Sequence, residues 1–180
     1  MTIHQMILNV LCSLIGSFIF LFLVLIMFKP KIVISPFVCK GKFANADPSF
    51  YYFIKVINIS LFSAYDQNVE LLQIDYYPAG KGQMNTRQIS LSLVEGSIRK
   101  IPGYRPSWIR KNAPYAVKVR TTENLEEILA QDAKAIAVKV SLRHGLTGLV
   151  KVGSKEYNDE SQVKMGKFAY GLKFGPLKWS

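Results

Sequence analysis

The stretch from Met6 to Phe28 constrains this chain most, because it contains no charged side chain. As an α-helix rising about 1.5 Å per residue, it is long enough to cross a hydrocarbon core of roughly 30 Å. Only a helix satisfies its own backbone hydrogen bonds in lipid, so we predict a transmembrane helix over 6–28 after an extracytoplasmic head at 1–5. A cleaved signal peptide is the alternative, but no Lys or Arg precedes the run and no small-residue cleavage site follows it.

Basic side chains gather on one side of this helix. Lys29, Lys31, Lys40 and Lys42 follow it, whereas the N-terminal side offers only the α-amino group and His4. Positive residues stay on the cytoplasmic side of a membrane, so we place the N-terminus outside and the C-terminal domain in the cytoplasm. We expect the four lysines to face anionic lipid head groups.

The net charge of +11 comes from 23 basic and 12 acidic side chains. A basic surface beside a bilayer attracts anionic lipid, and solubility alone is the alternative explanation. We expect no nucleic-acid partner, because the sequence shows no basic run with interleaved aromatic residues, no zinc-ligand spacing and no Gly-rich RNA motif. The two cysteines, Cys12 in the apolar run and Cys39 beyond it, are too far apart for a mutual disulfide.

Roughly 150 residues follow the helix, enough for one domain with its own core. We predict a juxtamembrane linker with a first strand at 29–49 and the remainder of a β-sandwich at 50–180. The predicted strands are rich in β-branched and aromatic residues: 32–38, 50–60, 65–77, 87–94, 115–121, 135–142, 149–157 and 167–174. Short strands separated by Gly-, Pro- and Asn-containing turns are typical of an antiparallel sandwich or barrel.

Segment 121–130 departs from the β pattern and predicts a short helix. Thr122 is the expected N-cap, with Leu125, Ile128 and Leu129 on one face. The carboxylates of this segment fit a capped and solvated first turn better than acid–base catalysis.

A loop near residues 101–110 carries aromatic and basic side chains. It is a candidate partner surface, and the alternative is that its aromatic rings close one end of the sandwich. The residues concerned are Tyr104, Arg105, Trp108 and Arg110.

Motifs for catalysis are missing from this sequence, which has no Gly-rich phosphate loop, nucleophile elbow or zinc-protease motif. His144 is the only histidine after the apolar run and lies in a turn-like segment. The sequence indicates no nucleophile and no orienting carboxylate that would let His144 act as a general base. One histidine and one cysteine are too few ligands for a metal site. We therefore predict a protein that is not an enzyme and needs no cofactor.

A basic-Pro-basic step, Lys29-Pro30-Lys31, follows the apolar run, and a later strand-like run ends in Asn58 and a small turn. These and further segments resemble, in the same order, the inner helix and cytoplasmic domain of inward-rectifier potassium channels. Segment 28–35 is similar to the linker after the inner helix, and 53–60 is similar to a strand ending in an Asn and a small turn. The further similar segments are 64–72, 121–129, 135–140 and 149–168. The resemblance implies an immunoglobulin-like sandwich hung from one helix, with Lys29 and Lys31 at positions that bind anionic lipid in that family.

The outer helix, pore helix and selectivity filter of that family have no counterpart in this sequence, which offers no second apolar segment to frame a filter. We therefore expect a non-enzymatic, single-pass interaction or sensor module that self-associates or binds a partner beneath the bilayer. The alternative is an accessory or pore-forming membrane protein whose copies bring their helices together. Small and polar residues suited to helix association are Asn9, Ser13, Gly16 and Ser17.

Overall fold

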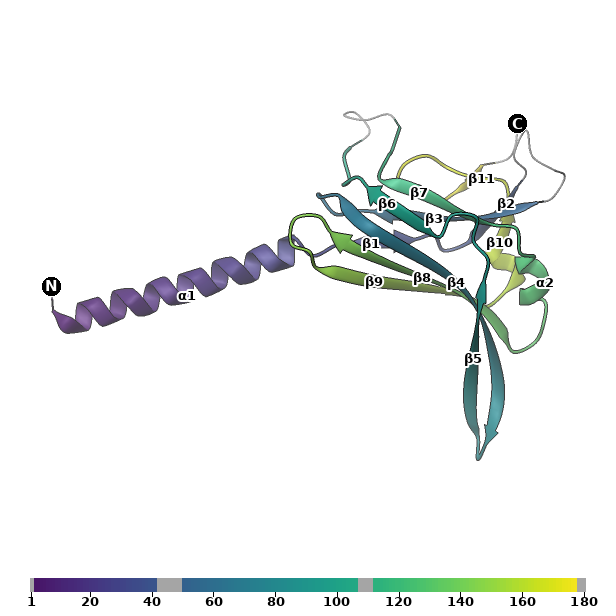
Figure 1. Cartoon of the computed structure of the whole chain (residues 1–180), viewed down its shortest axis with the longest axis horizontal. Helices are drawn as coiled ribbons and strands as arrows, with labels where there is room; N and C mark the ends of the chain where they lie inside the picture. Colours follow the sequence, from purple (N-terminus) through teal and green to yellow (C-terminus); the bar gives the residue numbers. More distant parts are fainter. Residues whose placement is uncertain (1, 42–49, 107–111, 178–180) are drawn as a thin grey trace.

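The computed structural model describes residues 2–41, 50–106 and 112–177. One long helix, α1 (Ile3–Met27), extends from a domain made mostly of β-strands (Figure 1). Its apolar part, Ile3–Ile26, contains an 18-residue stretch with a mean hydropathy of 2.6, and no residue of that stretch is buried. By length and composition α1 is able to cross a membrane, as the sequence predicts.

The first sheet, sheet A, is built around β3 (Tyr51–Asn58). One edge of β3 pairs antiparallel with β1 (Ile32–Ile34) and β2 (Val38–Gly41), and the other edge pairs with β7 (Ala116–Thr121). β10 (Val163–Met165) runs parallel to β2. Pro36 falls between β1 and β2, where a residue without a backbone N–H interrupts no ladder.

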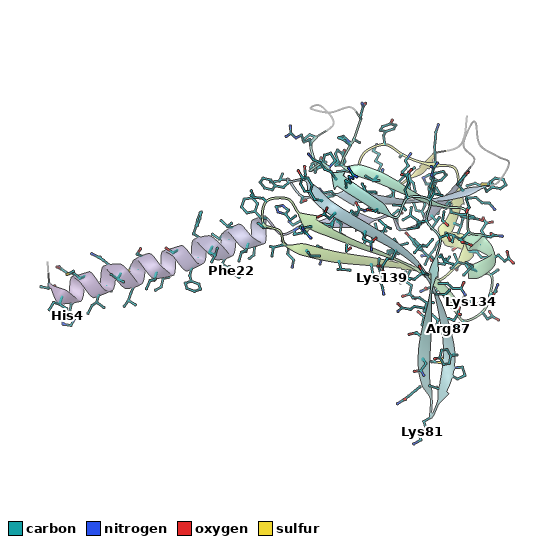
Figure 2. The ribbon with its side chains drawn as sticks, in the orientation of Figure 1. His4, Phe22, Lys81, Arg87, Lys134 and Lys139 are labelled. Atoms are coloured by element: carbon teal, nitrogen blue, oxygen red, sulfur yellow. The ribbon has the colours of Figure 1, made fainter. Side chains whose placement is uncertain are left out.

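The second sheet, sheet B, has the strand order β5-β4-β8-β9, with β6 also pairing β4. Its strands are β4 (Ala64–Gly80), β5 (Gln83–Leu91), β6 (Ser97–Ile101), β8 (Lys134–His144) and β9 (Val150–Tyr157). The ends of β4 and β5 leave the sheet as a hairpin with Lys81 at its tip (Figure 2). A third, two-stranded sheet joins β11 (Lys167–Phe168) to β12 (Pro176–Leu177).

The main core takes side chains from both sheets. Ile54 and Val56 of β3 pack in one cluster with Val138 and Val140 of β8. Leu125 and Leu129 of α2 (Leu125–Leu129) join that cluster from one end. The prediction of a mostly β domain with a short helix near 121–130 is therefore confirmed.

Some sequence-based boundaries are wrong. The N-cap of α2 is Asn124, not Thr122, because the Asn124 side chain accepts the Glu127 backbone N–H at 3.4 Å. Only the start of the predicted strand 167–174 is a strand. In the rest of that segment, the carbonyls of Ala169, Gly171 and Lys173 accept hydrogen bonds from the Lys55 side chain of sheet A. The predicted strand 32–38 ends at Ile34, and β2 begins only at Val38. A 3₁₀ turn (Glu160–Gln162) and the strands β2, β6, β10 and β12 were not predicted.

Candidate membrane-facing surface

The end of α1 packs into the β domain through an aromatic contact. The Phe28 ring, at the helix C-cap, lies 4.9 Å from the Phe62 ring and 6.2 Å from the His144 ring, between centroids. The Phe62 and His144 rings are 5.4 Å apart. We call the part of the domain around this contact, loops 59–63 and 102–104 with turn 145–149, the membrane-proximal end (Figure 1).

Asn58 holds the loops of this end together. Its side-chain nitrogen donates to the carbonyls of Phe62 at 3.0 Å, Pro102 at 3.2 Å and Ile101 at 3.4 Å. Its side-chain oxygen accepts the Ser60 N–H at 3.0 Å and the Ser60 hydroxyl. Asn58 is completely buried, so each of these bonds replaces one that water would otherwise make.

Two glycines allow the loops to pack this closely. A Cβ on Gly103 would lie 2.2 Å from the Leu61 carbonyl oxygen, and one on Gly145 would lie 2.4 Å from the Tyr65 ring. The Gly145 N–H also donates to the Ser63 carbonyl at 3.0 Å. Loop 59–63 is therefore fixed between its two neighbours and beneath the end of α1.

His144 is a structural part of this end. Its Nδ1 lies 3.3 Å from the Thr147 backbone nitrogen, which can only donate, so Nδ1 accepts and the ring proton sits on Nε2. Burial lowers the pKa of His144, which keeps the ring neutral at physiological pH. The Nε2 atom has no hydrogen-bond partner within the described residues, as is also true of the buried Gln67 amide.

Basic side chains surround the membrane-proximal end. Lys29 and Lys31 are exposed at the junction, and the Lys31 carbonyl accepts the Ile59 N–H at 2.9 Å. On sheet B, Lys100 of β6 and Arg143 of β8 lie on either side of Tyr65 of β4, at the same position in the strand register. Asp66 neutralises part of this charge, since it lies 3.3 Å from the Arg143 guanidinium. The surface nearest the end of α1 is thus predominantly cationic.

Lys40 lies elsewhere, although the sequence suggested that it follows the membrane closely. Its ammonium group pairs with Glu126 of α2, which lies at the end of the domain away from α1 (Figure 1). The Tyr52 hydroxyl donates to the Asn124 side-chain oxygen at 2.9 Å and lies 3.4 Å from the Glu126 carboxylate. This pairing removes the geometric reason for assigning Lys40 to lipid, because β2 carries it away from the junction. Lys42 lies outside the described residues.

The other predicted site residues fall in two places. Tyr104 packs edge-on against Tyr115 at 5.1 Å and donates its N–H to the Ser60 carbonyl, next to the Asn58 network. Arg105 is exposed, whereas Trp108 and Arg110 lie outside the described residues. In α1, helical spacing puts four exposed residues on one face: Asn9, Ser13, Gly16 and Ser17.

Lys55 forms a second polar centre, on the outer face of sheet A. Its ammonium group donates to three carbonyls of the C-terminal segment: Ala169 at 2.7 Å, Gly171 at 2.6 Å and Lys173 at 2.9 Å. All three ammonium protons are thereby used, so Lys55 acts as a clamp rather than as a nucleophile. Burial and the nearby Lys118 charge lower the pKa of Lys55 to about 8. The alternation of side chains along β3 predicts that Lys55 points away from Ile54 and Val56. It does not predict that Lys55 binds the C-terminal segment.

An open hollow of about 360 Å³ adjoins the Lys55 clamp, lined in part by Lys118, Phe168 and Tyr170. Burial raises the pKa of the neighbouring Cys39 thiol to about 11, so the thiol stays protonated and unreactive. No group of three His, Cys, Asp or Glu side chains among the described residues is arranged to hold a metal ion.

No protein-family model matches the chain, and no curated protein matches it. One solved structure similar to it is the X-ray structure of Northeast Structural Genomics Consortium target SoR45, at 12% sequence identity. The match covers 71% of this chain and 83% of that chain, with a TM-score of 0.34. A similarity of this size carries no argument about fold family or function.

Proposed function

We propose that this protein is a non-enzymatic, single-pass membrane-anchored interaction or sensor module whose β domain rests on anionic lipid at the cytoplasmic face. The observation that carries the proposal is the contact of Phe28 with Phe62 and His144. It fixes one cationic end of the domain beside the end of an apolar helix long enough to span a bilayer.

Charge supports the proposed orientation. Lys29 and Lys31 flank the C-terminal end of α1, whereas the residues before the helix carry no Lys or Arg. The positive-inside rule therefore favours a cytoplasmic domain, and the cytoplasmic leaflet is also the one that presents anionic lipid. The topology and the lipid charge therefore both favour contact between the cationic end of the domain and the cytoplasmic leaflet.

We further propose that the two sheets form an immunoglobulin-like sandwich of the kind found in the cytoplasmic domain of inward-rectifier potassium channels. The shared core of β3 and β8 supports the sandwich. Asn58, which ends its strand and organises the following turn, supports the likeness within segment 53–60. Fold similarity alone does not carry channel activity.

Changing both Lys29 and Lys31 to Gln is expected to loosen the domain from anionic membranes. Each lysine near an anionic surface contributes about 1 kcal/mol, so the pair contributes about 2 kcal/mol. We would reconstitute the full chain into bilayers, attach a fluorophore at a Met84→Cys site on the hairpin, and measure its rotational anisotropy. Anisotropy should fall in the variant on anionic bilayers, and added salt should produce the same fall in the wild type.

The matched control changes Lys81 and Arg87 to Gln, which removes the same charge from the projecting hairpin (Figure 2). This variant should keep the anisotropy of the wild type. If both pairs lower the anisotropy equally, the net charge of the chain, rather than the membrane-proximal end, holds the domain against lipid.

A second candidate is an accessory or pore-forming membrane protein that assembles through α1. It is favoured by the exposed helix face that carries Asn9, Ser13, Gly16 and Ser17, because small residues allow two helices to approach closely and Asn can bond between them. The oligomeric state in mild detergent, followed by ion flux in reconstituted vesicles, distinguishes this candidate from a monomeric anchor.

A further inference from the structure

We infer that Leu61 and Leu146 at the membrane-proximal end insert into the interfacial layer of the bilayer and fix the tilt of the β domain. This inference rests on the proposed function, because it needs the domain to lie at the membrane. It adds an apolar contact to the electrostatic one. The two leucines then contact the phospholipids themselves, at the level where α1 leaves the hydrocarbon core.

The position of the two leucines follows from the Phe28 contact. Leu61 directly precedes Phe62, and Leu146 lies two residues after His144, so both adjoin the rings that pack on Phe28. The Gly145 to Ser63 hydrogen bond of 3.0 Å joins the two loops. Because Phe28 ends the apolar run of α1, these loops lie at the depth of the head groups when the helix spans the membrane.

The exposure of these side chains fits a partner of apolar chemistry. Leu61 is 70% exposed and Leu146 is 62% exposed, the highest values for any described leucine outside α1. Val150, at 63%, extends the surface from turn 145–149 along β9. Apolar side chains bordered by Lys31, Lys100 and Arg143 match a bilayer interface, which is apolar below and anionic above.

The test uses the full chain with labelled Leu and Met methyl groups in nanodiscs, with and without a lipid that carries a nitroxide near its glycerol backbone. Leu61→Ile and Leu146→Ile variants assign the two signals. Both signals should lose more than half of their intensity when the nitroxide lipid is present. The methyl group of Met84, which is 59% exposed on the hairpin, provides the matched control and should keep its intensity.

The insertion would be overturned if the nitroxide lipid reduced the methyl signals of Leu61 and Leu146 no more than that of Met84. The measurement is made in phosphatidylcholine and in phosphatidylcholine mixed with phosphatidylserine. Equal broadening in both lipids, unchanged by Lys29→Gln and Lys31→Gln, would support insertion while contradicting the electrostatic part of the proposed function. Charge-dependent anisotropy without broadening would support the proposed function and overturn the insertion.

Discussion

Replacing Lys55 by Met is expected to lower the free energy of unfolding by about 3 kcal/mol, because three partly buried carbonyls lose their charged donor while the apolar stem is kept. For a domain of this size, the melting temperature should fall by about 6–12 °C. Thermal unfolding of the full chain in detergent, followed by near-ultraviolet circular dichroism, measures this change. Trypsin should also cleave the variant faster at Lys173, once the C-terminal segment is released.

The pH dependence gives an independent check on the same residue. Burial holds the pKa of Lys55 near 8, below its ordinary value of 10.5. Between these values the unfolded chain binds more protons, so the contribution of Lys55 to stability rises as pH increases. The stability gap between the wild type and Lys55→Met should therefore widen from neutral pH to about pH 10.

Lys81→Met is the matched control, since Lys81 is exposed at the tip of the hairpin that leaves sheet B, whereas Lys55 lies on sheet A. Surface substitutions of this kind usually change stability by less than about 0.5 kcal/mol. The Lys55→Met variant would contradict the clamp if its melting temperature equalled that of the control and trypsin cleaved the two variants at Lys173 at the same rate.

Replacing Asn58 by Asp is expected to destabilise the membrane-proximal end by about 3–5 kcal/mol. The change keeps the size of the side chain but removes both donors and buries a carboxylate against the carbonyls of Phe62, Ile101 and Pro102. Urea unfolding of the full chain in detergent measures the loss. Hydrogen exchange should show the largest loss of protection in loop 59–63.

Asn85→Asp makes the same chemical change at an exposed position of the hairpin, and it should leave stability almost unaltered. Equal stability of the two variants would mean that the Asn58 amide does not organise the loops beneath α1.

Periodicity predicts much of this fold from the sequence. The alternation of β3 separates Ile54 and Val56, which face the main core, from Lys55, which faces the C-terminal segment. The apolar run of α1 is not the core helix of a folded domain, because none of residues 3–26 is buried. Local patterns of this kind are set by the period of a strand or helix, so one sequence suffices to find them.

The candidate site could be predicted only in part, because spatial neighbours need not be neighbours in sequence. Lys40 follows the helix closely along the chain, yet β2 carries it to Glu126 at the other end of the domain. Conversely, Leu146 and Lys100 are distant from α1 in sequence. The pairing of β8 and β6 with β4 brings them close to the end of α1. The partners of Lys55 are backbone carbonyls, which no residue pattern reveals.

The central claim, a cytoplasmic β domain behind a single spanning helix, is tested most directly by cysteine labelling in intact cells. A membrane-impermeant thiol reagent should label a Thr2→Cys variant without lysis and should label Met84→Cys only after the membrane is permeabilised. The wild type controls for Cys12 and for the buried Cys39. Labelling of Met84→Cys in intact cells, with protection of Thr2→Cys, would reverse the orientation and contradict the account.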